Sequence, residues 1–198
     1  MRSIVVYCGS NFGTNSVYAE AAFALGQELA KRSIKVIYGG GGMGLMGKVA
    51  DGSLQSGGSV IGIIPNFLAK LENAQKTLTE LHFVETMHER KSKMVALSDG
   101  VIALPGGYGT MDELFEILTW AQLKIFSGPV GVLNINGYYD LLLLQLDKMT
   151  EEGFLHPENR KLLLVSDNAE DLLAKMEEFV IQNPGNKPLD KSLYVNQK

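Results

Sequence analysis

The chain has 198 residues, of which 45% are hydrophobic and 20% are charged, a composition that suits one folded domain with a substantial core. Its formal net charge of −4 at pH 7 argues against a general binder of nucleic acids or membrane surfaces. A single cysteine, Cys8, leaves no disulfide within the chain, and no apolar run approaches the ~18 residues of a membrane helix. We therefore expect a cytoplasmic protein that has no nucleic-acid or membrane partner.

Short β-branched runs alternate along the chain with longer segments of helical period. The predicted strands are 3–8, 34–38, 59–64, 82–85, 101–104 and 130–134, with a seventh candidate at 162–165. The predicted helices are 16–32, 44–56, 86–98, 110–125, 138–152 and 169–181. The strands are continuous apolar runs, which is typical of a parallel sheet covered by helices on both faces.

This alternation predicts a single-domain α/β protein with a doubly wound, Rossmann-like fold over residues 1–182. We expect a mostly parallel sheet of about six to seven strands, with ligands bound beyond their carboxyl ends. Residues 183–198 contain two prolines and many polar residues, so we predict a flexible tail there. Residues 66–81 are interpreted as a short helix and a mobile loop near the site.

The first glycine-rich loop, residues 39–47, follows a predicted strand and opens a helix, an arrangement that aims backbone N–H groups at an anion. Residues 42–47 match the GxGxxG pattern of dinucleotide sites. The strand that follows, with its end at 59–66, has no aspartate or glutamate to bind a ribose hydroxyl. A mononucleotide or sugar phosphate is therefore favoured over a dinucleotide, and a purely structural tight turn is the alternative.

The second glycine-rich loop, residues 105–110, also follows a strand and runs into a helix, so a phosphorylated ligand held from both sides is expected. Thr110 and Glu113 fit the S/T-x-x-E capping box, in which both side chains satisfy N–H groups of their own helix. The same glutamate would lie close to any ligand at the loop. From the residues alone, capping and chemistry both stay open for Glu113.

Residues 87–94 form a charged segment in which Arg90 and Lys91 share a helix face with Met87. The opposite side carries Glu89, Ser92 and Lys93. Two cations on a semi-buried face need an anion, and a structural salt bridge or a phosphate ligand would each supply it. No metal site is predicted, because the cysteine and the nearby histidines have no metal-ligand spacing.

Together, the GGGxMGLMG loop, MHxRK and PGGxGTxxE resemble the Lonely Guy (LOG) family. This family consists of phosphoribohydrolases that cleave cytokinin riboside 5′-monophosphates to a free base and ribose 5-phosphate. The resemblance runs from residues 6–10 to 151–154, roughly four fifths of the chain. Family members have carried the label "lysine decarboxylase", but no residue context here identifies a pyridoxal-phosphate lysine. The resemblance implies a homodimer and a nucleoside monophosphate substrate, with no metal or organic cofactor.

Carried over by motif, the resemblance implies that Arg90 and Glu113 are the catalytic pair. The residues that it implies for phosphate or nucleotide binding are Ser10, Gly40, Gly41, Gly42, Gly44, Met87, Lys91, Gly106, Gly107, Gly109 and Thr110. Cleavage passes through an oxocarbenium-like transition state, so Glu113 would stabilise positive charge and orient or deprotonate water. Arg90 would hold the nucleotide or donate hydrogen bonds toward the leaving base. The implied homodimer agrees with a helix whose outer face carries Phe115 and Leu123.

Two alternatives share the same motifs. One is a nucleosidase of the same fold that prefers AMP or another purine nucleotide; it would differ in the pocket around the N6 substituent, which residues 66–81 would build. The other is a noncatalytic nucleotide or cofactor carrier, which would keep the glycine loops but would not require Glu113.

Overall fold

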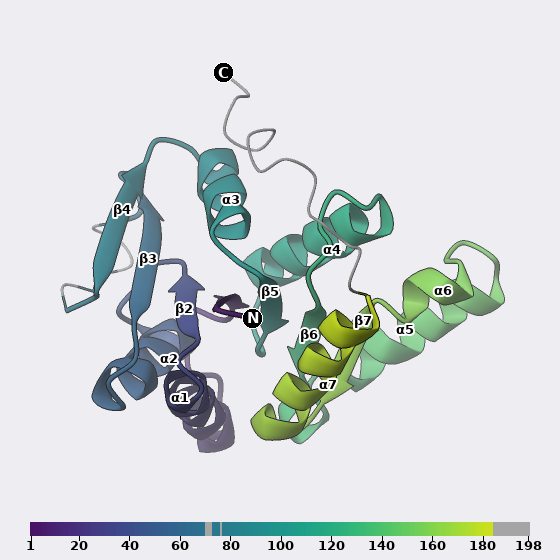
Figure 1. The fold of residues 1–198 in the computed structure, drawn as a ribbon, viewed down its shortest axis with the longest axis horizontal. Coiled ribbons are helices and arrows are strands. Elements are labelled where there is room, and N and C mark those ends of the chain that lie inside the picture. The colour runs from purple at the N-terminus through teal and green to yellow at the C-terminus, as the bar shows by residue number, and fades with distance from the viewer. Residues whose placement is uncertain (70–72, 76, 184–198) are drawn as a thin grey trace.

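The structure is a computed structural model that describes residues 1–69, 73–75 and 77–183. Within these residues, seven strands form one sheet in the order β4-β3-β2-β1-β5-β6-β7, and every neighbouring pair is parallel (Figure 1). The strands are β1 (Ser3–Tyr7), β2 (Lys35–Tyr38), β3 (Val60–Pro65), β4 (Glu80–Val84), β5 (Gly100–Ala103), β6 (Val130–Leu133) and β7 (Leu163–Ser166). The seventh candidate is confirmed as the edge strand β7.

Helices cover both faces of the sheet, as Figure 1 shows. They are α1 (Ser16–Lys31), α2 (Gly44–Gln55), α3 (Met87–Ala96), α4 (Tyr108–Gln122), α5 (Asp140–Glu151), α6 (Pro157–Arg160) and α7 (Ala169–Gln182), with a 3₁₀ turn η1 (Ile135–Gly137). The short α6 was not predicted from the sequence. In the described part of the chain, no helix has the length and apolar character needed to cross a bilayer.

The buried strand β1 shows why the sheet has two covered faces. Ile4 and Val6 belong to the core shared with α1, α2 and α7, whereas Val5 and Tyr7 belong to the core shared with α3, α4 and α5. Because successive side chains of a strand point to opposite faces, a continuous apolar run buries both faces at once. The doubly wound α/β fold predicted from the sequence is confirmed.

Helix α4 begins at Tyr108, two residues earlier than predicted, and its N-cap is Gly107 in an extended conformation without a side-chain cap. Thr110 therefore lies inside the first turn, where its side chain packs against Gly106: a Cβ at Gly106 would lie 2.1 Å from Thr110 Oγ1. Glu113 lies more than a turn inside the helix, beyond the reach of the N-terminal N–H groups. The capping-box interpretation of Thr110 and Glu113 is wrong.

The described part of residues 66–81 contains turns and a strand start in place of the short helix that we expected. Gly42 N donates to Asn73 O at 3.0 Å, and Gln75 N donates to Gly40 O at 3.0 Å. The first glycine loop therefore pairs through its backbone with residues 73–75. Residues 70–72 and 76, and the predicted tail from 184 onward, lie outside the described residues.

Candidate functional site

A cavity of about 480 Å³ lies beyond the carboxyl ends of β1 and β5. These strands are neighbours, and the chain runs from β1 to one side of the sheet and from β5 to the other. Ligands bind at such a switch point because the loops that follow the two strands separate there. The volume is in the usual range for a small-molecule site.

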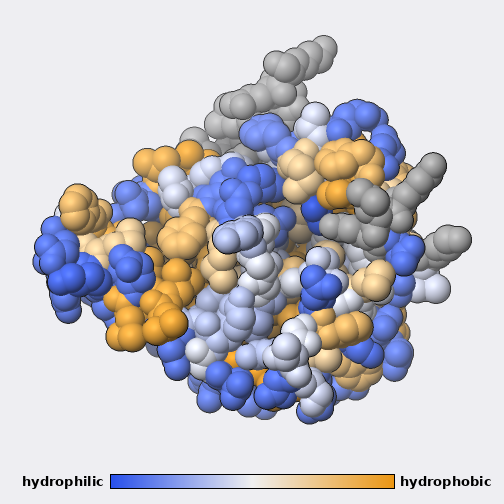
Figure 2. All heavy atoms as spheres, turned by 180° about the vertical axis from the view of Figure 1, so that it is seen from behind, coloured by the Kyte–Doolittle hydropathy of each residue, from blue (hydrophilic) through white to orange (hydrophobic). Residues whose placement is uncertain are grey.

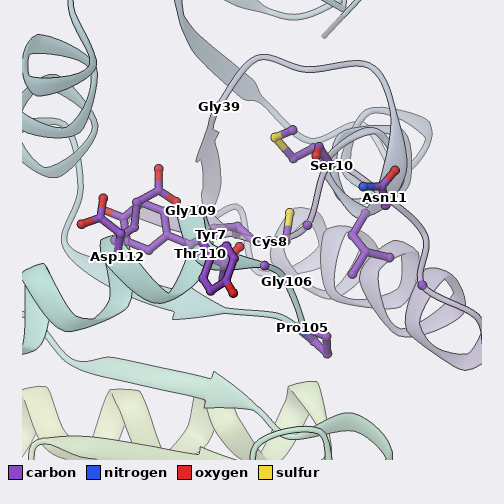
Figure 3. A pocket seen from close by; sticks show the side chains of 18 of the residues that line it. Tyr7, Cys8, Ser10, Asn11, Gly39, Pro105, Gly106, Gly109, Thr110 and Asp112 are labelled. Atoms are coloured by element: carbon purple, nitrogen blue, oxygen red, sulfur yellow. The ribbon is translucent and has the colours of Figure 1, made fainter.

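Two chain segments, residues 6–13 and 105–110, form much of the lining. Figure 3 shows Ser10 and Asn11 on one side of the cavity and Gly109 and Asp112 on the other. The predicted site residues that line it are Ser10, Met87, Arg90, Gly106, Gly107, Gly109, Thr110 and Glu113. The structure thus brings together the second glycine loop, the implied catalytic pair and the loop after β1.

The first glycine loop lies largely outside this lining. The predicted residues that do not line the cavity are Gly40, Gly41, Gly42, Gly44 and Lys91. Gly44 has a φ of +63°, and a Cβ there would lie 2.2 Å from the carbonyl carbon of Ser10. This close approach requires glycine, and it supports the loop that carries Ser10. The four predicted glycines of this loop thus lie behind the cavity wall and not in its lining.

The second loop presents the bare N-terminus of α4 to the cavity. Among the described residues, the N–H groups of Gly107, Tyr108, Gly109 and Thr110 have no hydrogen-bond acceptor. A Cβ at Gly107 or Gly109 would meet nothing within 4 Å, so the protein's own packing leaves room beside both residues. A helix N-terminus with free N–H groups and open space beside it can hold a phosphate.

Arg90 is buried in the cavity wall with a relative exposure of 6%. Its Nε donates to Ile63 O at 3.2 Å and its Nη2 donates to Gly39 O at 3.1 Å. A Cβ at Gly39 would lie 1.9 Å from this Nη2, so the missing side chain of Gly39 makes room for the guanidinium. A backbone carbonyl just after β2 and another within β3 therefore fix the orientation of the Arg90 side chain.

The predicted faces of α3 are only partly confirmed. Arg90 and Met94 are buried as expected, but Ser92, which was placed on the water-facing side, is buried too. The buried positions Arg90, Ser92, Met94 and Val95 cover more than half of the helix circumference, so α3 buries more than the single face that was predicted.

Lys91 bridges α3 and α4. Its Nζ lies 3.1 Å from Asp112 Oδ2 and 3.1 Å from Glu116 Oε2, and only 15% of the side chain is exposed. Two carboxylates of α4 thus neutralise the ammonium group of Lys91, which does not line the cavity. Lys91 links the helix that carries Arg90 to the helix that carries Glu113.

The carboxyl group of Glu113 lines the cavity and has an unusually high pKa. Burial disfavours its charged form and raises the pKa of the carboxyl from 4.5 to about 7. The positive charges of Arg90 and Lys91 oppose this rise, and the negative charges of Asp112 and Glu116 add to it. A carboxyl with this pKa can take up and release a proton near neutral pH.

Several lining residues were not identified as site residues from the sequence. They are Tyr7, Cys8, Asn11, Gly39, Asp112 and Tyr138, among others. Burial raises the pKa values of the Tyr7 hydroxyl and the Cys8 thiol, which keeps both groups protonated. Tyr7, Cys8 and Gly39 lie at or just after the ends of predicted strands, and that position was the signal that could have identified them.

Neither a cluster of metal-ligating side chains nor a lysine is found in the cavity lining among the side chains that the structure describes. No group of three or more His, Cys, Asp or Glu residues among them could hold a metal ion. No lysine is among the described residues that line the cavity.

The fold and the cavity define a Rossmann-like α/β protein in which free N–H groups at a helix start and a titratable carboxyl line one cavity. A protein-family model described as "Possible lysine decarboxylase" matches residues 46–176. "Cytokinin riboside 5'-monophosphate phosphoribohydrolase LOG3" of Arabidopsis thaliana is 48% identical over 178 residues, which cover 90% of this chain and 83% of the relative. The LOG1 protein of the same name and organism is 46% identical over 179 residues, covering 90% and 84%. The chain belongs to this family, the Lonely Guy family that its motifs resemble.

Solved structures agree on the fold alone. The molybdenum cofactor binding protein of Rippkaea orientalis has a TM-score of 0.69 at 20% identity and covers 91% of this chain and 98% of its own. The Moco carrier protein of Chlamydomonas reinhardtii has a TM-score of 0.66 at 18% identity, with coverages of 91% and 98%. At such identities the likeness carries no information on ligands.

Proposed function

We propose that this protein hydrolyses the N-glycosidic bond of nucleoside 5′-monophosphates, with cytokinin riboside 5′-monophosphates as the substrate class, releasing a free adenine-type base and ribose 5-phosphate. One observation carries the proposal: the free N-terminus of α4 and the Glu113 carboxyl, with a pKa of about 7, line the same cavity. The names of the relatives at 48% and 46% identity support the same reaction.

In this reaction, the N–H groups at the start of α4 hold the 5′-phosphate, and the ribose extends toward Glu113. Ionised Glu113 orients a water molecule and takes its proton as the water oxygen bonds to the anomeric carbon. The bond between that carbon and the base breaks, and its electron pair leaves with the base. The base takes up a proton from solvent, and Glu113 then returns the proton of the attacking water to solvent. Two backbone carbonyls fix the guanidinium of Arg90, which stabilises the negative charge that develops on the leaving base.

The test replaces Glu113 by Gln, which keeps the size and polarity of the side chain and removes its charge. We expect free-base release from AMP and from isopentenyladenosine 5′-monophosphate to fall by at least roughly 100-fold, because general-base catalysis is lost. The matched control is Glu20→Gln on the exposed surface of α1, which should retain full activity. Thermal melting of all three proteins checks that each one is folded.

Hydrolysis by Glu113→Gln within a few fold of the unchanged protein would contradict the role of the carboxylate. If the unchanged protein is folded and binds both nucleotides but releases no base, the noncatalytic carrier is favoured instead. Faster release from AMP than from the isopentenyl nucleotide would favour the purine nucleosidase. Leu68 and Met87 give the cavity apolar lining that suits an alkenyl substituent, so we expect the isopentenyl nucleotide to react faster.

A further inference from the structure

Three successive carbonyl groups precede the N-terminus of α4, and each accepts a hydrogen bond from another part of the chain. Leu104 O accepts from the Tyr139 hydroxyl at 2.6 Å, and Pro105 O accepts from Gly9 N at 3.0 Å. Gly106 O accepts from the hydroxyl of Tyr138. Two adjacent tyrosines after β6 therefore hold the backbone that enters the second glycine loop.

Holding the carbonyls of Pro105 and Gly106 also orients the N–H groups of Gly106 and Gly107. The carbonyl of Leu104 precedes Pro105, which has no N–H, so the Tyr139 hydroxyl fixes the position of the backbone that enters the loop. In a trans peptide, the C=O of one residue and the N–H of the next point in opposite directions, and the described chain has no cis peptide bond. The hydroxyl that fixes Gly106 O therefore fixes the direction of Gly107 N–H. Gly107 lines the cavity, and its N–H is among those that have no acceptor in the described residues.

The tyrosines are themselves held rigidly by a tight turn. Asn136 and Gly137 have φ values of +53° and +68°, and Tyr139 N donates to Asn134 Oδ1 at 2.7 Å. The rings of Tyr138 and Tyr139 meet edge to face, with centroids 5.1 Å apart at 89°. Tyr18 of α1 contacts the Tyr138 ring in the same manner, at 6.0 Å and 79°. Such contacts restrict both rings and therefore both hydroxyl groups.

We propose that Tyr138 and Tyr139 are positioning residues, whose hydroxyls hold the 104–106 backbone so that the N–H groups of the second glycine loop converge on the substrate phosphate. The inference rests on the proposed function for the identity of the ligand. Tyr139 is fully buried, and its hydroxyl is occupied by Leu104 O, so it acts through the loop and not by contact with substrate. Tyr138 lines the cavity and is 41% exposed, so its ring could also contact substrate directly. A variant of Tyr139 therefore gives the clearer test of positioning through the loop.

The experiment compares Tyr139→Phe and Tyr138→Phe, which remove one hydroxyl each and keep the ring. Calorimetry measures the Kd of ribose 5-phosphate and of adenine, and steady-state kinetics measure KM and kcat for the nucleotide. In both variants we expect the Kd of ribose 5-phosphate and KM to rise roughly fivefold to tenfold, the effect of one hydrogen bond, while the Kd of adenine stays within about twofold. The matched control is Ser3→Ala, because Ser3 Oγ donates to the backbone carbonyl of Leu97 at 2.9 Å at the opposite end of β1.

An unchanged Kd for ribose 5-phosphate in Tyr139→Phe would overturn the proposal. Equal weakening of ribose 5-phosphate and adenine would also overturn it, because a merely structural defect affects both halves of the site. If Tyr139→Phe does not fold, Tyr138→Phe tests the hydroxyl that holds Gly106 O, and an unchanged Kd for ribose 5-phosphate in that variant would overturn the proposal. If the unchanged protein binds ribose 5-phosphate but cleaves no nucleotide, the proposed function fails, and the two Kd values still decide the role of the tyrosines.

Discussion

At the scale of single residues, the cavity wall holds a guanidinium that backbone carbonyls orient and a carboxyl whose pKa is raised by burial. Arg90 is buried and oriented by the carbonyls of Gly39 and Ile63. Glu113 lies where burial disfavours its ionised form, so its pKa is about 7. Buried groups of this kind favour catalysis at the expense of the stability of the ligand-free fold.

The pKa of Glu113 leads to a prediction about stability. Between pH 4.5 and about pH 7, the folded protein binds more protons at Glu113 than the unfolded chain does. The free energy of unfolding therefore falls as the pH rises through this window, by up to roughly 3 kcal/mol, and this contribution is constant on either side of it. Glu113→Gln lacks this loss, so we expect it to be more stable than the unchanged protein at about pH 8 and similar to it at about pH 4.

Urea denaturation of the ligand-free proteins at the two pH values measures the difference. Glu20→Gln, on the exposed surface of α1, is the control and should follow the unchanged protein at both pH values. A stability gain in Glu113→Gln that is the same at both pH values would show that Glu113 does not titrate in this window.

At the scale of elements, the start of α4 combines two kinds of glycine. A Cβ at Gly106 would lie 2.1 Å from Thr110 Oγ1 and 2.9 Å from the backbone N of Gly9, so the fold itself requires glycine there. A Cβ at Gly109 would meet nothing within 4 Å, so the fold does not require glycine at that position. The open space beside Gly109 is where we place the phosphate.

This contrast predicts opposite effects for the two alanine variants. Gly109→Ala should melt at the same or a slightly higher temperature, because alanine favours a helix over glycine by roughly 0.5–1 kcal/mol. Its KM for the nucleotide should rise by roughly tenfold, because the methyl group occupies space beside the N–H groups. Gly106→Ala should melt at a lower temperature, since overpacking of this kind costs about 1–3 kcal/mol. A normal KM in Gly109→Ala would refute the location of the phosphate.

Much of this arrangement could be predicted from the sequence, for reasons that differ between elements. The strands and most helices follow from period and composition, because an apolar run such as 3–7 must be buried on both faces. The start of α4 was predicted two residues late, because a capping-box pattern resembles a helix start even where glycine caps the helix. The backbone pairing of residues 40–42 with 73–75 could not be predicted, because it joins segments far apart in sequence through groups that every residue has.

Contacts between segments far apart in sequence also limit what the sequence can predict about the site. Motifs pointed to Arg90 and Glu113, and both residues line one cavity, although the strands before them, β4 and β5, are not neighbours in the sheet. Motifs could not show that Lys91 pairs with Asp112 and Glu116, since helix phase gives the face of a lysine and not the neighbour across from it.

At the scale of the whole molecule, exposed apolar side chains occur on two helices at one side of the sheet. Phe115 of α4 is 39% exposed, and Leu123, the C-cap residue that follows this helix, is 58% exposed. On α5, Leu141 is 81% and Leu144 is 64% exposed. Figure 1 shows α5 at the right, and Figure 2, seen from behind, shows an apolar area at the lower left, which is the same end of the molecule. Apolar area of this kind is a usual site of association between protein chains.

We predict a homodimer that forms through the α4 face. Besides Phe115, a shallow groove on this face is lined by Met111, Thr119 and Trp120 and by the carboxylates of Asp112 and Glu116, which gives an apolar centre and a polar rim. Light scattering during size exclusion should give twice the chain mass for the unchanged protein. Phe115→Asp should give a single chain mass, because a carboxylate would be buried without a partner at the centre of the interface. The control, Leu141→Asp on α5, should remain a dimer. If Leu141→Asp dissociates while Phe115→Asp stays a dimer, the chains associate through α5 and the prediction is wrong.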